Sequence, residues 1–383
     1  QAQFKYNAVE FYTSITLGKT TYQRNGLYEN GFFPGDNYVS SLGDVSSFGK
    51  SKRLSFLNYG IKVGLTYKIT GKHIIDVNGN YFTKAPAIRN SFSNARQSNQ
   101  TVLGLDNERI HSMDIGYIFR TPIVKMRLTG FYSNVKDGTD IGFFFTENLN
   151  NFVQEVQTNI SKQRLGIEVG IDAKISPTIN LKAAASVGQF IFSNDPNVYY
   201  IAADFKNNNG KKTVLTYGDG TTALKNTHLS GGPERAVQLG FEYRDPNFWN
   251  IGVTSNFFSN AYIDASALKR SASFSQDIGL LPIDSNNNLI IPEGGNISGY
   301  TINNYDDNTA KKLLQQEQLD SYILVNMIGG KSWRIKQYYL GVFATINNVF
   351  DQKYITGGFE QSRRVDYKSG VAWEDAGGGG GGA

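Results

Sequence analysis

Apolar and polar side chains alternate along much of the chain, and the clearest case is the stretch 55–69. Its apolar positions fall on every second residue: Tyr59, Ile61, Val63, Leu65, Tyr67 and Ile69. Successive side chains of a β-strand point to opposite faces, so this stretch predicts a strand with one continuous apolar face. The pattern resumes over 72–83 after Thr70-Gly71-Lys72, a segment typical of a tight turn. The two stretches together predict a β-hairpin.

Four further hairpins follow from the same alternation, and their turns lie near residues 121, 177, 246 and 330. We predict that 111–120 pairs with 125–135, 165–175 with 181–187, 237–243 with 249–257, and 320–328 with 337–347. The segment 4–17 is rich in β-forming residues, although its alternation is only fair. Counted together, these segments give about eleven strands, the first of which is expected to run away from the short turns.

Long polar connections of roughly 20–55 residues separate the predicted hairpins. Residues 138–160 are expected to be a connection with strand-like segments, residues 194–232 a loop, and residues 264–318 the longest connection. Residues 309–319 have the composition of a short loop helix. Strict alternation of short turns with long loops is typical of a membrane barrel, whose turns are short on one side only.

The spacing of the tyrosines agrees with a membrane barrel. Tyr59 and Tyr67 are separated by about 27 Å along a strand, or about 20 Å of height at a tilt of roughly 35–45°. This is near the height of the apolar band that aromatic girdles flank in outer-membrane barrels. The predicted fold class is all-β, a transmembrane antiparallel β-barrel with about 11–12 strands in this chain.

The amino-acid composition supports a strand-rich protein and limits the classes of partner that it can bind. The 383 residues include 22 Tyr, 25 Phe and no cysteine, which excludes disulfides and thiolate metal sites. No run approaches the 18 apolar residues of a transmembrane helix, and no signal-peptide segment is present. The net charge of +5 is spread along strands and loops, so we expect membrane lipid and no nucleic acid as a partner.

Sites for chemistry are weakly indicated. The three histidines, His73, His111 and His228, are not spaced as metal ligands, and the calcium-like run from Asp284 has Leu289 where a glycine is needed. Neither a phosphate-binding loop nor a nucleophile elbow is found, and we therefore predict no enzyme and no cofactor. A Ser/His pair at a barrel rim remains a minor alternative.

Aromatic and polar clusters in the predicted loops suit ligand binding. The candidate ligand-facing residues are Arg96, Tyr199, Tyr200, Tyr300 and Tyr305. Aromatic faces with amides suit sugars, siderophores or peptides equally well. The alternative is that these side chains pack loop against loop, and for any single residue this alternative is slightly favoured.

The segment from Gly341 to Tyr354 resembles a conserved-looking signature near the C-terminus of TonB-dependent outer-membrane receptors. The residues that match are Asn347, Asn348, Phe350, Asp351 and Tyr354, to which we give a structural role. Residues 81–96 and 105–117 resemble the central barrel of Bacteroidetes members with a carboxypeptidase-regulatory-like domain. The resemblance implies that 1–368 is the C-terminal half of a 22-stranded barrel in the bacterial outer membrane.

The same resemblance implies uptake of an unidentified ligand through a plug-gated lumen. TonB would act through an N-terminal plug that this sequence lacks, and a surface lipoprotein or other complex subunits are further expected partners. Two alternatives stay open: a non-transporting scaffold barrel in an outer-membrane complex, and a complete barrel of about 12 strands. Residues 369–383 end in six glycines and Ala383 and are expected to be an irregular tail, typical of a placeholder or tag.

Overall fold

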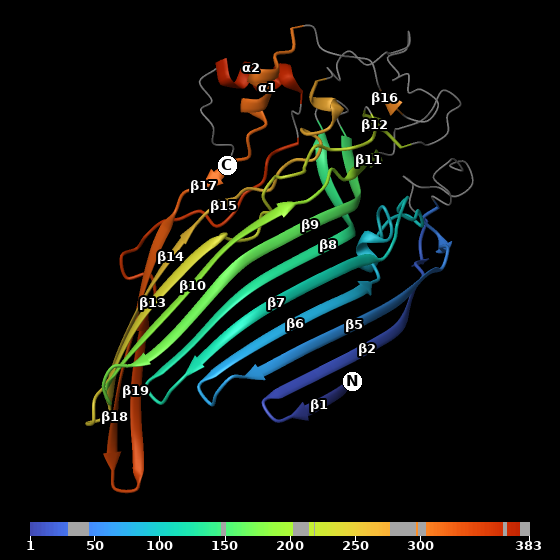
Figure 1. Cartoon of the computed structure of the whole chain (residues 1–383). Helices are drawn as coiled ribbons and strands as arrows, with labels where there is room; N and C mark the ends of the chain where they lie inside the picture. The colour runs from blue at the N-terminus through green and yellow to red at the C-terminus, as the bar shows by residue number, and fades with distance from the viewer. Residues whose placement is uncertain are drawn as a thin grey trace, which may run out of the picture.

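The computed structural model describes residues 1–29, 46–146, 151–201, 214–217, 219–275, 296–297, 304–362 and 366–375. One large antiparallel sheet dominates it (Figure 1). Twelve strands follow one another along the sheet: β1 (Ala2–Tyr6), β2 (Val9–Tyr22), β5 (Leu54–Lys68), β6 (His73–Lys84), β7 (Glu108–Arg120), β8 (Val124–Thr146), β9 (Asn151–Lys174), β10 (Ile179–Phe192), β13 (Arg235–Arg244), β14 (Trp249–Ser259), β18 (Tyr322–Ile335) and β19 (Tyr338–Ile346). A thirteenth strand, β11 (Asn197–Ile201), pairs only with the upper part of β9.

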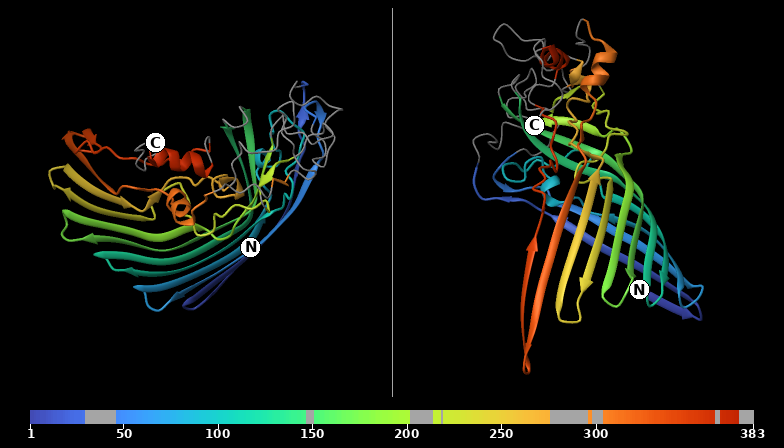
Figure 2. Two further views of the ribbon diagram at one scale, coloured as in Figure 1. Left: turned by 90° about the horizontal axis from the view of Figure 1, so that it is seen from above. Right: turned by 90° about the vertical axis from the view of Figure 1, so that its left-hand side faces the viewer.

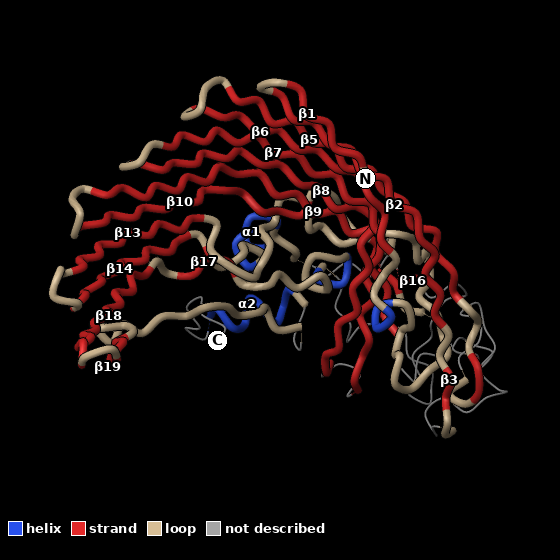
Figure 3. Tube along the Cα trace, turned by 90° about the horizontal axis from the view of Figure 1, so that it is seen from below, coloured by secondary structure: helices blue, strands red, loops and turns tan. Residues whose placement is uncertain are grey.

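The sheet is curved like a trough, with short turns at one end and the long connections at the other (Figures 1 and 2). The long connections fold over the concave side together with α1 (Asp307–Leu313) and α2 (Tyr367–Asp375) (Figure 3). They also contain the small strands β3 (Asn25–Gly26), β4 (Gly49–Lys50), β12 (Thr216–Tyr217), β15 (Ala261–Tyr262), β16 (Asn296–Ile297) and β17 (Gln318–Leu319). Within the described ranges, no helix is long and apolar enough to cross a membrane.

The outer, convex face of the sheet is apolar and exposed. On β5 its side chains are between 39% and 48% exposed: Tyr59, Ile61, Val63, Leu65 and Tyr67. Cross-strand neighbours in a register share a face, and Val63 lies opposite Thr13 of β2 and Gly79 of β6. Phe190 and Phe192 of β10, which have the opposite parity, pack against residues of the long connections. Because those connections lie on the concave side (Figure 3), the opposite parity faces that side. The exposed apolar side chains of the convex face need an apolar surrounding to be stable.

The concave face is polar, and hydrogen bonds run across its strands. Tyr12 Oη donates to Asn78 Oδ1 at 3.2 Å, and Asn78 Nδ2 donates to Asp114 Oδ2 at 2.8 Å. Arg127 of β8 forms an ion pair with Asp76 of β6 at 3.0 Å. Polar side chains of neighbouring strands thus contact one another on the concave face, and this face can meet water.

Glycine lets large side chains lie flat on the concave face. A Cβ atom on Gly64 would be 2.1 Å from Cε1 of Tyr12 and 2.6 Å from Oδ1 of Asn78. Tyr12 is directly opposite Gly64 in the register of β2 and β5. Since real Cβ atoms do not approach other atoms so closely, only glycine fits at this position.

The predicted fold class and the first four hairpins are confirmed. The β5–β6 hairpin turns at residues 69–72, and Thr70 Oγ1 accepts hydrogen bonds from the backbone N–H groups of Lys72 and His73. Twelve strands in the sheet path agree with the predicted 11–12. β1 and β19 end the described sheet and do not pair with each other, so the expectation of a closed barrel of about 12 strands is not what the structure shows.

Three predictions about the two ends of the sheet are wrong. The segment 4–17 is two strands, because Asn7 adopts a positive φ of 51° and makes a turn between β1 and β2. The first strand consequently runs toward the short turns. The last predicted turn, near 330, lies inside β18, and the chain reverses at Lys336, whose φ is 56°. Gly330 looks like a turn residue, but it is paired with Phe343 while Asn250 Oδ1 leaves no space for a Cβ.

Two predicted loops contain regular structure. Residues 138–146 and 151–160 belong to the tall strands β8 and β9, whose register shifts around Gly138. Residues 194–232 contain β11 and β12. The predicted loop helix is confirmed as α1, although it covers only Asp307–Leu313, with Asp306 accepting from Thr309 N at its start. Helix α2 covers the beginning of the expected tail, and residues 376–383 lie outside the described residues.

Candidate functional site

The long connections form a packed layer over the end of the concave face, which we call the loop layer. Its described parts are 84–107, 193–201, 214–217, 219–233, 260–275, 304–321, 347–362 and 366–375. The layer has an apolar core of its own that includes Val153, Tyr200, Leu215, Leu224 and Leu268. Since sheet residues and two long connections, the one between β10 and β13 and the one between β14 and β18, share this core, these loops hold each other in place over the concave side.

Two predicted ligand-facing residues lie inside the loop layer. Tyr199 and Tyr200 of β11 are 7% and 1% exposed. Tyr199 Oη accepts a hydrogen bond from the backbone N–H of Leu103 at 2.9 Å, and burial raises its pKa. The Tyr200 ring meets Phe144 edge-on, 6.2 Å between centroids. Both side chains are packed between connections, which is the alternative that the sequence left open for them.

Glu155 is a buried carboxyl group in the upper part of β9, where β9 pairs with β11 above the wall. It is 8% exposed and lies opposite Gly142 and Tyr200 in the register. Gln157 Nε2 donates to Glu155 Oε1 at 2.9 Å. Burial raises the pKa of Glu155 to about 7, and the nearby charges of Asp140 and Asp264 act in the same direction. This group therefore titrates near neutral pH.

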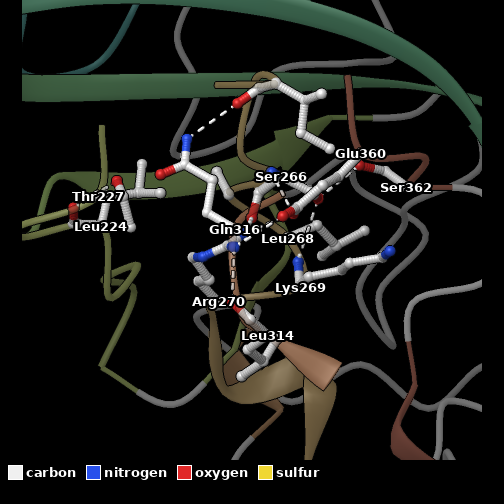
Figure 4. A network of polar contacts seen from close by, with 12 residues as sticks. Leu224, Thr227, Ser266, Leu268, Lys269, Arg270, Leu314, Gln316, Glu360 and Ser362 are labelled. Atoms are coloured by element: carbon white, nitrogen blue, oxygen red, sulfur yellow. Dashed lines mark hydrogen bonds and ion pairs between the residues drawn. The ribbon is translucent and has the colours of Figure 1, made fainter. Parts of the chain in front are cut away.

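A buried ion pair between Arg270 and Glu360 joins two connections of the loop layer (Figure 4). The guanidinium group binds both carboxylate oxygens, with Nη2 to Oε1 at 2.7 Å, and Nη2 also donates to the carbonyl oxygen of Leu314 at 2.8 Å. The two side chains are 4% and 10% exposed. A bidentate pair of this kind fixes orientation as well as distance. We call this contact the clasp.

Backbone contacts beside the clasp extend the connection between the two segments. Asp264 N donates to the carbonyl oxygen of Gly358 at 2.9 Å, and Glu360 N donates to that of Asp264 at 2.9 Å. Ser266 N donates to Glu360 Oε2 at 2.8 Å. Burial raises the pKa of Asp264. The segment after β19 is thereby bound to the connection after β15, across the concave side.

The other predicted ligand-facing residues are scattered. Arg96 is exposed and lines a pocket of about 410 Å³ with Arg24, Leu27 and Tyr28. Tyr305 is half-buried, and its ring lies 4.8 Å from that of Tyr367. Tyr300 lies outside the described residues. The structure thus does not gather the four described candidates in one site, and the clasp was not predicted from the sequence because its partners are 90 residues apart.

The signature after β19 forms a turn at the top of the wall. Asn348 and Asp351 have positive φ values of 50° and 49°, and Asn348 exchanges hydrogen bonds with Gln352. The ring of Tyr354 stacks on that of Tyr322, 4.3 Å away. Asn347 and Phe350 are exposed. Asparagine and aspartate tolerate this backbone conformation better than most residues, which accounts for their places in the turn.

The three histidines lie on separate elements. His228 stacks on Tyr262 at 3.8 Å, and its Nδ1 is 2.8 Å from Glu234 Oε1. His73 and His111 contact aromatic rings of neighbouring strands. Across the part of the chain that the structure describes, no group of three or more His, Cys, Asp or Glu residues is arranged to hold a metal ion.

The architecture is that of a segment of an outer-membrane β-barrel wall with an overlying loop layer, and solved structures of such transporters are similar to it. The copper transporter OprC aligns with a TM-score of 0.54 at 10% identity, over 92% of this chain and 42% of its own. The FrpB iron transporter from Neisseria meningitidis (F3-3 variant) gives 0.52 at 13% identity, over 92% and 40%. The ferric-catecholate import receptor Fiu from K12 E. coli gives 0.50 at 12%, over 92% and 39%.

These likenesses establish the fold alone, since the identities are low. No family model matches the sequence, and no curated protein is similar to it. The chain spans about 40% of the length of the solved structures that it matches.

Proposed function

We propose that this chain is part of the wall and ligand-side loops of an outer-membrane receptor that takes up a solute through a plug-gated lumen. The observation that carries the proposal is the contrast between the two faces of the sheet. The outer face exposes a continuous apolar surface with tyrosines toward both ends, whereas the concave face is crossed by hydrogen bonds and ion pairs. An apolar band with aromatic girdles suits a bilayer, and the polar face suits an aqueous lumen.

The fold likeness supports uptake as the activity, because the similar structures are described as transporters or import receptors of copper, iron and a ferric catecholate. We further propose that residues 1–368 are the C-terminal half of a TonB-dependent receptor barrel of the Bacteroidetes type. The support is the signature from Asn347 to Tyr354. On this proposal the plug and the other barrel strands are supplied by residues outside this sequence, and TonB is a partner protein that acts through the plug.

Unpaired sheet edges agree with that proposal. β1 and β19 are each bonded on one side only within the described sheet. Backbone groups without partners are very costly in lipid, so a wall segment with two such edges requires further strands beside them.

The test is cell fractionation combined with uptake by a strain that lacks the full-length gene. We expect the protein to be integral to the outer membrane, and we expect the deletion to abolish uptake of one siderophore, glycan, peptide or metal complex from a panel. A protonophore should abolish that uptake in the parent strain. Normal uptake of the whole panel, with loss of a co-purifying complex, would instead identify a scaffold barrel.

A further inference from the structure

A belt of basic side chains lines the concave face near the short turns. Register places its members on this face, since each is opposite a concave-face residue of the next strand. We call the following residues the basic belt: Lys5, Lys68, Arg120, Lys125, Lys174, Lys182 and Arg244. They come from seven strands, β1, β5, β7, β8, β9, β10 and β13, and therefore run across nearly the whole described sheet.

Carboxylates on the same stretch of this face are fewer and are shared. Glu10 pairs with Lys5 at 3.5 Å and with Lys68, and Glu242 pairs with Lys182 at 3.4 Å and with Arg244 at 2.6 Å. Asp172 lies in the register between Lys125 and Lys182. Asp76 on the same stretch is neutralised by its ion pair with Arg127, so Asp76 and Arg127 add nothing to the balance.

Seven cations and three carboxylates leave an excess of four positive charges on the belt, against +5 for the whole chain. Most of the net charge of the chain is thus concentrated at one level of one face. Among the described residues, Arg120, Lys125 and Lys174 make no ion pair. Like charges along a low-dielectric wall reinforce each other's potential and attract ions of the opposite sign.

We propose that the basic belt attracts anionic solutes bearing carboxylate or phosphate groups, so that the solute carried through the lumen is an anion. This inference rests on the proposed function, which makes the concave face the lining of the lumen. The exposed ends of Lys125 and Lys174 are free to meet such a solute.

The chain has no cysteine, so single cysteines can report the local potential in a full-length receptor whose other cysteines, where there are any, are replaced by serine. Asn180→Cys places a thiol between Lys174 and Glu242 in the register, and Ser186→Cys places one higher on the same strand, opposite Glu168. The full-length receptor is reconstituted in vesicles, and thiol modification is timed with an anionic sulfonatoethyl and a cationic trimethylammonium-ethyl methanethiosulfonate. The anion-to-cation rate ratio should be about fivefold higher at Asn180→Cys than at Ser186→Cys in low salt, and the difference should vanish near 1 M salt.

Two double variants that each remove two positive charges test whether the basic belt causes the higher anion-to-cation ratio. Lys125→Gln with Lys174→Gln should reduce the ratio at Asn180→Cys to that at Ser186→Cys. Lys19→Gln with Lys136→Gln removes the same charge from the outer face and should leave the ratio unchanged. Asn250→Cys, opposite Arg244, is a second belt position in case the first variant fails to assemble.

The outcomes separate this inference from the proposed function. Equal anion-to-cation rate ratios at Asn180→Cys and Ser186→Cys would overturn the inference that the solute is an anion. They would not affect the proposal that the concave face lines a lumen. If none of the concave-face thiols reacts with either reagent, the lumen itself, and with it the proposed function, is overturned.

Discussion

The wall and the loop layer use the same backbone geometry in opposite surroundings. All nine residues of β19 are exposed, whereas four of the five residues of β11 are buried. The wall turns its apolar side chains outward and depends on lipid to cover them, while the loop layer encloses an apolar core like a soluble domain. A substitution should therefore affect membrane assembly in one region and loop order in the other, and the following predictions separate the two effects.

The largest effect is expected from charges on the outer face. Val63→Arg combined with Leu65→Arg places two cations near the middle of the apolar band, at a cost of about 2–4 kcal/mol each. Assembly, measured by heat-modifiable mobility of the outer-membrane protein, should fall strongly. Thr66→Arg is the control, because Thr66 faces the concave side opposite Glu10 and Asp76 and should tolerate a cation. Equal assembly of both variants would refute the assignment of the two faces.

The next largest effect is expected at the clasp. Arg270→Met leaves the Glu360 carboxylate buried without its cation, which costs about 3–5 kcal/mol. Hydrogen exchange and limited proteolysis should increase across 263–275 and 355–362. The heat-modifiable electrophoretic mobility, which reports assembly of the wall, should stay unchanged. Arg270→Met with Glu360→Met should recover most of the protection. If the single variant also failed to assemble in the outer membrane, the wall and the loop layer would have to fold as one cooperative unit.

A smaller effect is expected at Gly64. Gly64→Val inserts a side chain where Tyr12 and Asn78 lie, and overpacking of this kind costs about 1–3 kcal/mol. The midpoint of urea unfolding in lipid vesicles should decrease. Gly170→Val is the matched control, because a Cβ at Gly170 meets nothing within 4 Å. Similar losses for both variants would show that β-strand glycine is needed for some other reason.

The smallest effect is expected at Glu155 and depends on pH. Its pKa of about 7 in the folded protein exceeds its ordinary value of 4.5, so the folded state holds the proton more tightly. Stability should accordingly fall as the pH rises from about 4.5 to 7 and remain low above it. Glu155→Gln should remove this dependence and protect the β11 amides by about 1–2 kcal/mol more than the parent protein at pH 8. At pH 5 the two proteins should exchange alike, and a difference there would contradict the burial of the carboxyl group.

The wall could be predicted because its signal is local. Alternation on β5 and the turn at Thr70 require only adjacent residues, and both were found. The prediction failed where an unusual contact decides the structure. Gly330 lies within β18 and is paired with Asn250 on one side and Phe343 on the other, and no single segment of the sequence reveals this pairing.

The loop layer could not be predicted because its contacts join distant segments. Arg270 and Glu360 are 90 residues apart, and each looks like an ordinary loop charge in the sequence. For β11 a weak signal was present, since Val198, Tyr199, Tyr200 and Ile201 form a short apolar run after Pro196. Such a run is typical of a strand buried on both faces, so it favours a structural position over a ligand-facing one.

The order of strands along the wall has a consequence for how the protein is made. Apart from the short strands in the connections, each strand of the path pairs with the strands that precede and follow it in the sequence. The hairpins at the short turns therefore close at a small entropic cost that favours rapid pairing, whereas strands such as β10 and β13 pair across a long connection. The wall can grow one hairpin at a time during biogenesis, and at every stage its newest strand is the template for the next.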